Sequence, residues 1–348
     1  MTVELIERLD RAGAFAPTRR FDDLDRFHVP FDQLFGDTDT EARLRNLVTT
    51  HRRVAVCAQS GEGKSSVISS VVGPLALDPT SGVLPIRIPV GSAPDATVTT
   101  TEGFLRHLLG AVLCWSDQNE LSRRQGRAIA KLKAELQERQ ETCRGGLTLP
   151  LWFISPDIAR EVSRTVRPFE TYSDHLACVR RVVEVVGSWG RHVVFVLDDT
   201  DGWLRSAERD RTELAAAFFS GPFHALVREM GGGLVIALHD DYLDMEDVRR
   251  ACEHLDGRIE LPRLDRVAVD GLRRILERRV SEVVGTDVRL TEVMESTAIA
   301  RLAEGYRSGL NLRAALRVAA TALEHGQRNS APTITAGLME LALAQELR

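Results

Sequence analysis

The sequence has few cysteines, and none of them belongs to a recognisable metal or redox pattern. Five occur among 348 residues, with no CxxC pair and no cysteine–histidine cluster at zinc spacing. We therefore expect neither a disulfide framework nor a zinc site. This usage is typical of buried thiols in a reducing cytosol. The five are Cys57, Cys114, Cys143, Cys178 and Cys252.

Long apolar runs are also missing. The first residues, MTVELIERLDRAGAF, are acidic and amphipathic, without the basic start and apolar core of a signal peptide. No segment reaches the roughly 18 apolar residues that indicate a membrane span. The sequence therefore predicts a cytoplasmic protein with no membrane partner.

A strong charge bias is absent as well. The formal net charge is −5, which gives no general attraction to nucleic acid and argues against a DNA-coating protein. A local basic patch stays compatible with this charge. The basic residues of 123–133 are diluted by neighbouring glutamates, so they give DNA binding little support.

Apolar runs and amphipathic segments alternate up to about residue 262, and the rest of the chain has helical patterning. The alternation predicts a parallel α/β sheet, and the tail predicts a small helical lid. We expect an N-terminal helix and lead-in over 1–27, a core over 28–262 and a lid over 263–348. The expected strands are 52–60, 82–90, 191–199, 232–241 and 258–265. The expected helices are 2–12, 38–51, 64–75, 100–115, 171–190, 211–230 (interrupted at Gly221-Pro222), 267–283, 290–304, 309–325 and 333–347.

Two segments depart from the alternation. Residues 16–37 are expected to be an extended lead-in with a bend at Pro30. Residues 118–147 are highly charged and fit a solvated helix, whereas 147–169 fit a hairpin, an irregular insertion or a helix. We interpret 118–170 as an insertion that meets a partner; a solvated helix without a partner is the alternative.

The stretch AQSGEGKS follows a predicted buried strand and precedes a predicted helix, which is the context of a phosphate-binding loop. Its glycines allow torsions and close approach that side chains would obstruct. Backbone N–H groups and the helix N-terminus can then surround phosphate oxygens. Lys64 is expected to bridge the β- and γ-phosphates of ATP, and Ser65 to bind Mg²⁺. A glycine-rich turn with a surface lysine is the alternative. The expected nucleotide contacts are Ala58, Gln59, Ser60, Gly61, Glu62, Gly63, Lys64, Ser65 and Ser66.

Two aspartates end the apolar run VVFVLDD, which fits a central strand covered on both faces. The carboxyl ends of such strands bind ligands in open α/β sheets. Asp198 is expected to hold Mg²⁺ through water, and Asp199 to orient the attacking water. The alternative is a pair of aspartates that cap the turn.

The expected strand over 232–241 ends in VIALHDD. His239 is a candidate for a polar residue between the metal carboxylates and the γ-phosphate. A turn histidine with satisfied hydrogen bonds is the alternative. Asp240 and Asp241 then fit as helix caps.

Together these motifs resemble the AAA+ ATPases over about residues 28–325, especially the origin-recognition, helicase-loader and transposition-regulator branch, and also the related STAND ATPases. The phosphate loop resembles Walker A, VVFVLDD resembles Walker B and VIALHDD resembles sensor 1. SGLNLRAAL resembles the start of the sensor 2 helix, which implies that Arg313 lies over the phosphates. FHVPFDQLFGDTDTEARLRNLV resembles the lead-in of the family, which implies that His28, Val29 and Pro30 line the base pocket.

Several positions depart from the family pattern. Ala58 replaces the usual first glycine. Asp199 stands where many members have a catalytic glutamate, which makes slow hydrolysis or a switch role plausible. His239 replaces the commoner asparagine or threonine. The chain ends soon after the expected lid, so we expect no winged-helix DNA module.

The resemblance also implies a site completed by a neighbouring subunit, whose arginine stabilises transition-state charge. Arg249 and Arg250 are the candidates, and Arg258 is a third. Ordinary surface arginines on a helix are the alternative. ATP would then form or stabilise a homo-oligomer.

The sequence therefore favours an ATPase that acts as a nucleotide-dependent assembly switch on a macromolecular partner. The resemblance implies a DNA-linked process: transposition, replication or phage defence. The alternative is a STAND-like module that binds nucleotide with little turnover and controls a separate effector. A small-molecule kinase fits less well, because it predicts a compact acceptor lid rather than a long helical tail.

Overall fold

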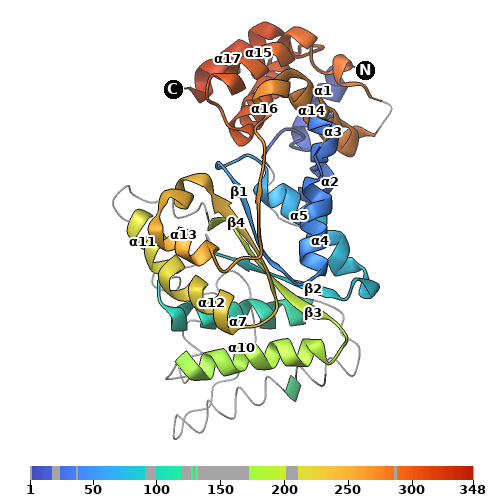
Figure 1. The fold of residues 1–348 in the computed structure, drawn as a ribbon. Coiled ribbons are helices and arrows are strands. Elements are labelled where there is room, and N and C mark those ends of the chain that lie inside the picture. The colour runs from blue at the N-terminus through green and yellow to red at the C-terminus, as the bar shows by residue number, and fades with distance from the viewer. Residues whose placement is uncertain are drawn as a thin grey trace, which may run out of the picture. The chain divides into compact units, whose positions relative to one another are not determined.

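The computed structural model describes residues 2–17, 24–36, 38–90, 99–118, 127, 130–131, 172–200, 211–285 and 288–347 (Figure 1). Its chain divides into two compact units. The loop–lid unit contains Met1–Leu44, Ala58–Gly73 and Glu260–Arg348, and the sheet unit contains Arg45–Cys57 and Pro74–Ile259. Each unit has its own hydrophobic core. Almost all of the expected insertion near 118–170 lies outside the described residues.

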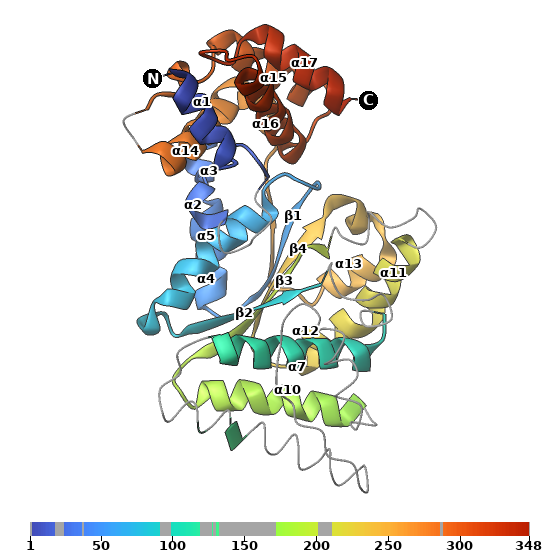
Figure 2. The ribbon, with the colours of Figure 1, turned by 180° about the vertical axis from the view of Figure 1, so that it is seen from behind.

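The predicted parallel sheet is confirmed, and it has five strands in the order β2-β3-β4-β1-β5 (Figures 1 and 2). Strand β4 therefore lies between β1, which leads into the phosphate loop, and β3, which ends in the two aspartates. Because the strands are parallel, their carboxyl ends share one edge of the sheet. The strands are β1 Arg53–Ala58, β2 Val83–Pro89, β3 His192–Asp198, β4 Gly233–His239 and β5 Gly257–Glu260.

The central strands are rich in β-branched and aliphatic residues, and they are buried along nearly their whole length. The register between β2 and β3 pairs Arg87 with Val196 and Pro89 with Asp198. Between β3 and β4, Leu197 pairs with Ile236. This register sets which side chains from separate strands meet at the carboxyl edge.

Helices α7 (Thr101–Gln118) and α10 (Tyr172–Gly187) lie side by side, α7 against β2 and α10 against β3 (Figures 1 and 2). The interruption expected at Gly221-Pro222 is a π-helical segment, Phe219–Phe223, between α11 (Arg211–Phe218) and α12 (His224–Glu229). A wider turn here accommodates the missing N–H of the proline. Helix α13 (Glu246–Cys252) follows β4.

The expected helical tail is confirmed. It comprises α14 Ala268–Val284, α15 Ser296–Arg307, α16 Leu312–Arg328 and α17 Ala336–Glu346. The N-terminal helix α1 (Thr2–Arg11) packs against α14 and α16, and Ile6 and Leu9 are fully enclosed in the lid core. Helix α5 (Lys64–Leu77) begins at the phosphate loop, and α4 (Thr40–Thr49) precedes β1.

The lead-in differs from the prediction. Residues 24–35 form two short helices, α2 (Leu24–Phe27) and α3 (Phe31–Phe35), rather than an extended segment. Pro30 does not bend an extended chain but occupies the N-cap of α3, where its missing N–H costs nothing. Phe31 and Phe35, four residues apart, stack on one face of α3 with ring centroids 5.9 Å apart.

Candidate nucleotide site

The phosphate loop is closed by its own lysine. Lys64 is buried, and its Nζ donates to the carbonyl oxygens of Ala58 at 2.8 Å and Gln59 at 2.9 Å. Ala58 is the last residue of β1 and does not have a positive φ, so the motif's first position needs no glycine here. The departure at Ala58 is therefore compatible with the loop.

Two glycines give the loop its shape. Gly61 and Gly63 have φ of 81° and 95°, which side chains rarely adopt. A Cβ at Gly63 would meet nothing within 4 Å, so the loop is open beside this residue. The N-terminal turn of α5 directly follows. Open space, backbone N–H groups and a buried lysine are what a polyphosphate requires.

The lid contacts the loop at Gly61. A Cβ there would lie 2.9 Å from both the Asn311 side chain and the Cβ of Arg313. Asn311 is the N-cap of α16, and its Oδ1 accepts from the Ala314 N–H at 2.8 Å. The structure therefore brings Arg313, named from the sequence, to the phosphate loop.

Glu62, at the crest of the loop, is buried against the lid. Its Oε2 accepts a hydrogen bond of 2.7 Å from the Tyr306 hydroxyl. Burial raises the pKa of the Glu62 carboxyl, and the Tyr306 hydrogen bond and the Arg263 charge offset only part of that effect. Arg263 also donates to the side-chain oxygen of Gln59. The side chains of two loop residues, Gln59 and Glu62, are thus hydrogen-bonded to lid residues.

The lead-in contacts the first turn of α5 through His28. Its Nε2 lies 2.8 Å from Glu41 Oε1, and its Nδ1 lies 3.1 Å from Ser66 Oγ. The Phe31 N–H donates to the same Glu41 oxygen at 2.9 Å. Burial opposes ionisation of Glu41, but its hydrogen bonds from His28 and Phe31 outweigh burial and lower its pKa. Of the two other residues predicted for the base pocket, Val29 is buried and Pro30 is half-buried.

Ionised Glu41 fixes the state of the imidazole. A carboxylate only accepts, so Nε2 donates to Glu41; in the neutral ring, Nδ1 then accepts from the Ser66 hydroxyl. The sequence predicted His28 and Ser66 separately. It did not predict Glu41 of α4, which bonds to His28 and Phe31 of the lead-in.

In the sheet unit, Asp198 lies at the carboxyl end of β3 and is almost fully buried. Arg87 of β2 pairs with it, with Nη2 3.2 Å from Oδ2. Arg87 is opposite Val196, so its side chain reaches diagonally to the residue two positions further on the same face. The sequence did not predict Arg87.

Asp199 has a left-handed backbone, with φ of 60°. Aspartate tolerates this conformation better than most residues, and such torsions are common at functional sites. The next residue, Thr200, is fixed to β4 through a hydrogen bond to the Ala237 carbonyl. Its own carbonyl accepts from the Tyr242 hydroxyl at 3.2 Å. The turn that carries Asp199 is therefore well anchored.

His239 ends β4 and caps the following 3-10 turn. Its Nδ1 accepts from the Asp241 N–H at 3.1 Å, so Nε2 carries the proton in the neutral ring. Asp240 and Asp241 lie in the first turn of that segment rather than at a cap. The Asp241 N–H in the turn thus satisfies the hydrogen-bonding capacity of Nδ1, and Nε2 can donate to another group.

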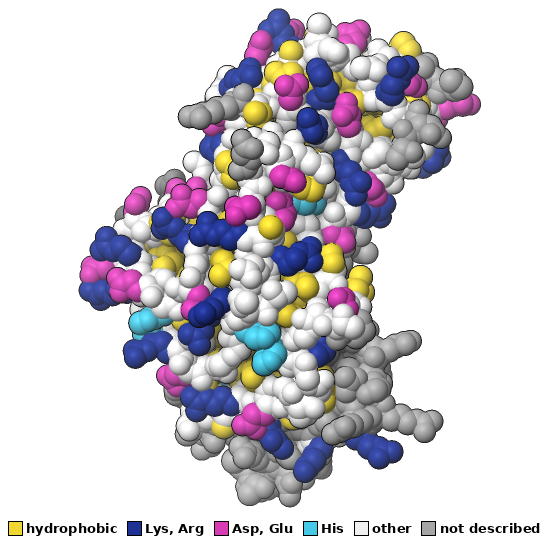
Figure 3. Space-filling view, turned by 45° about the vertical axis from the view of Figure 1, so that its right-hand side comes forward, with side chains coloured by type: hydrophobic (Ala, Val, Ile, Leu, Met, Phe, Trp, Pro, Cys, Tyr) yellow, Lys and Arg dark blue, Asp and Glu magenta, His cyan; other side chains and the backbone are white. Residues whose placement is uncertain are grey.

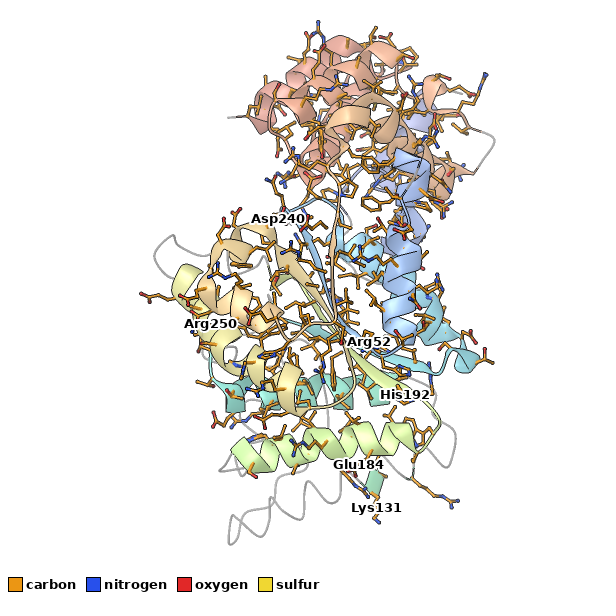
Figure 4. The ribbon with its side chains drawn as sticks, in the orientation of Figure 1. Arg52, Lys131, Glu184, His192, Asp240 and Arg250 are labelled. Carbon is orange, nitrogen blue, oxygen red and sulfur yellow. The ribbon has the colours of Figure 1, made fainter. Side chains whose placement is uncertain are left out.

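The carboxyl and amino ends of the strands lie at opposite edges of the sheet. Figure 4 labels Asp240 just beyond the carboxyl end of β4, and Arg52 and His192 at the amino ends of β1 and β3. Arg250 lies on α13 (Figure 4) and pairs with Glu246, and Arg249 and Arg258 are exposed.

The ligands expected for Mg²⁺ are the Ser65 hydroxyl and the Asp198 carboxylate. Both are hard oxygen donors, and few protein ligands suit an ion that keeps several waters and phosphate oxygens. Within the described residues, no group of three or more histidine, cysteine or acidic residues could hold a metal by itself. Each of these two side chains, in its own unit, therefore has the donor chemistry that suits Mg²⁺.

On the face drawn in Figure 3, basic and acidic side chains are interspersed over the described surface. Long-range attraction to a polyanion is weak on such a face. Among the helices that the structure describes, none is both long and apolar enough to cross a membrane.

Comparison with solved structures shows the fold. The ORC2 protein of Aeropyrum pernix, solved with ADPNP and ADP, matches with a TM-score of 0.52 and 13% identity, over 92% of this chain and 72% of that one. The Aeropyrum pernix ORC1 protein, solved in complex with DNA, matches with a TM-score of 0.49 and 15% identity, over 94% and 69%. No protein-family model and no curated protein sequence matches the chain. The chain thus has an AAA+-type α/β fold with a C-terminal helical lid.

Proposed function

We propose that this protein binds ATP with Mg²⁺ at the phosphate loop and hydrolyses it slowly, as a nucleotide-dependent assembly switch on a macromolecular partner. The observation that carries the proposal is the loop itself. Lys64 is buried and closes it, Gly61 and Gly63 have positive φ, and the first turn of α16 lies against it. An AAA+-type fold around such a loop favours nucleotide binding over an ordinary turn.

The residues would divide the chemistry. Backbone N–H groups of the loop and Lys64 would hold the phosphates, and Mg²⁺, held by Ser65 and Asp198, would neutralise charge on them. Asp199 would orient water, and the Nε2 proton of His239 would donate toward the phosphate side. Arg313 would respond to the γ-phosphate from the lid. Arg249 or Arg250 would act on the site of a neighbouring subunit.

The first experiment measures nucleotide binding and assembly of the full chain. Binding of ATP and ADP is followed by calorimetry, and mass by light scattering in each nucleotide. Lys64→Ala is expected to lose binding by at least tenfold, while the exposed Lys131→Ala serves as the matched control. Larger assemblies in ATP than in ADP support the switch, and absence of nucleotide binding in the unmodified protein overturns it.

The second candidate is a STAND-like signalling ATPase with little turnover. The observation in its favour is Asp199, whose carboxylate is one methylene shorter than the usual glutamate and sits on a left-handed backbone. A monomer that retains ADP through purification supports this candidate. Turnover stimulated by DNA, together with ATP-dependent assembly, supports the first.

A further inference from the structure

The crest of the phosphate loop is bonded to the lid through a side chain that phosphate binding itself does not require. Glu62 lies between the two positive-φ glycines, Gly61 and Gly63. Its carboxyl group is buried, with Oε2 accepting from Tyr306, and the backbone N–H of Leu312 in the lid also lowers its pKa. Placing a carboxyl group in such surroundings is costly unless it is held by a partner. The Tyr306 hydroxyl is therefore important to this loop conformation.

Tyr306 is well placed to hold it. The residue is fully buried near the end of α15. Its hydroxyl oxygen accepts a hydrogen bond from the Leu264 N–H at 3.4 Å, and the hydroxyl donates one to Glu62. The Arg263 guanidinium lies 5.5 Å from the centre of the Tyr306 ring and also bonds Gln59. The tyrosine thus joins three parts of the chain: the loop, the start of the lid and α15.

We propose that the Glu62–Tyr306 hydrogen bond holds the phosphate loop in its nucleotide-binding conformation, with Tyr306 as a positioning residue. This inference rests on the proposed function. Without the hydroxyl, the carboxylate leaves its buried position for water and carries the loop crest with it. Only the fraction of molecules with a formed loop binds, so apparent affinity falls by that fraction. The lid then tunes affinity through the loop, in addition to the role of Arg313 at the γ-phosphate.

The hydrogen bond and the charge can be separated by substitution. Tyr306→Phe removes only the hydroxyl and keeps the ring in the lid core. Glu62→Gln keeps an oxygen that accepts from Tyr306 but removes the charge, whereas Glu62→Ala removes both. Thr335→Val is the matched control, because it removes another lid hydroxyl, at the N-cap of α17.

The test is a double-mutant cycle on nucleotide affinity, with the full chain and ATP and ADP as probes. Tyr306→Phe is expected to raise the Kd for both nucleotides about tenfold, because the loop holds phosphates common to both. In the Glu62→Ala background the same change should have no further effect. Thr335→Val should stay within about twofold of the unmodified protein, whereas the effect of Tyr306→Phe should persist in the Glu62→Gln background, where an acceptor oxygen remains.

Two results would overturn the inference while leaving the proposed function intact. One is unchanged affinity in Tyr306→Phe; the other is an equal loss in the presence and absence of Glu62. If Glu62→Ala fails to fold, the cycle is run with Glu62→Leu, which also removes the acceptor and should likewise abolish the effect of Tyr306→Phe. A protein that binds neither nucleotide overturns the proposed function, and the inference with it.

Discussion

Arg87 Nη2 lies 3.2 Å from Asp198 Oδ2, so the candidate metal-binding carboxylate is paired with a guanidinium from the neighbouring strand. The Asp198 side chain is 3% exposed and that of Arg87 36%. The carboxylate is thus shielded from water while its partner reaches the surface. In such a pair, loss of the partner removes part of the charge compensation of a buried carboxylate.

Arg87→Ala is expected to destabilise the protein by about 1–2 kcal/mol, below the range for fully buried pairs because Arg87 is partly exposed. Mg²⁺ with ATP should restore more stability to this variant than to the unmodified protein, because the ion would supply the lost positive charge. Urea unfolding with EDTA and with Mg²⁺–ATP measures both effects. Arg181→Ala, which removes the exposed ion pair with Glu184 on α10, is the control. Equal stabilisation of both proteins by Mg²⁺–ATP would contradict the account.

Much of the fold could be predicted because its signals are local. The β-branched runs of β3 and β4 and the strand–loop–helix context of Lys64 lie within single short segments. Arg87 could not be found in this way. Its partner Asp198 is distant in sequence, and only the register of β2 against β3 brings them together.

The lead-in and lid show the same limit. Pro30 was expected to bend an extended segment. The spacing of Phe31 and Phe35, which places them on one face of a helix, is the sequence signal that indicates α3. Asn311 before α16 is a recognisable N-cap residue, so the helix start was predictable. Its contact with Gly61 was not, because it depends on lid packing.

Glu41→Gln is expected to weaken the link between the lead-in and α4. The lowered pKa of Glu41 means that its ionised form stabilises the folded state above the ordinary glutamate pKa and stops doing so as pH falls through the lowered value. The variant should therefore lose about 1 kcal/mol at pH 7 and less at pH 3, below the ordinary glutamate pKa of 4.5. Urea unfolding at the two pH values measures this difference. The same deficit at both would contradict the ionic explanation.

Because of His51, we expect the stability of the sheet unit to fall in acid. Its ring stacks on His192 with centroids 3.8 Å apart, and burial together with the His192 charge lowers the His51 pKa. The unfolded state therefore takes up the proton first as pH falls below about 6.5, and stability is lost until the folded-state pKa is passed.

Substituting His51 should reduce this loss. Asparagine is the suitable replacement, because it tolerates the φ of 59° at this position. The unfolding midpoint of His51→Asn is expected to change less between pH 7.5 and pH 5.5 than that of the unmodified protein. His254→Asn, at an exposed histidine, is the control. Parallel pH profiles for all three proteins would assign the acid sensitivity elsewhere.

Arg279 should be important for holding the N-terminal segment on the lid. It is buried on α14, where burial lowers its pKa to about 10, and its Nη1 donates to the carbonyls of Ala14 at 3.2 Å and Ala16 at 2.9 Å. Arg279→Met keeps the stem but removes both hydrogen bonds. It is expected to cost about 2 kcal/mol and to make the segment before residue 17 more accessible to proteases. Arg274→Met, at an exposed position of the same helix, is the control.

Gly61→Ala is expected to disrupt the loop for two separable reasons. Its φ of 81° disfavours a side chain, and the added Cβ would lie 2.9 Å from Asn311 and Arg313. Gly36 provides the matched control, because its φ is 89° and a Cβ there meets nothing within 4 Å. Gly36→Ala should cost about 1 kcal/mol from torsion alone, with nucleotide binding unchanged. Gly61→Ala should cost at least about 1 kcal/mol more and lower nucleotide affinity at least tenfold. Calorimetry and urea unfolding of the pair measure both quantities, and equal costs would show that the lid yields at Gly61 without loss.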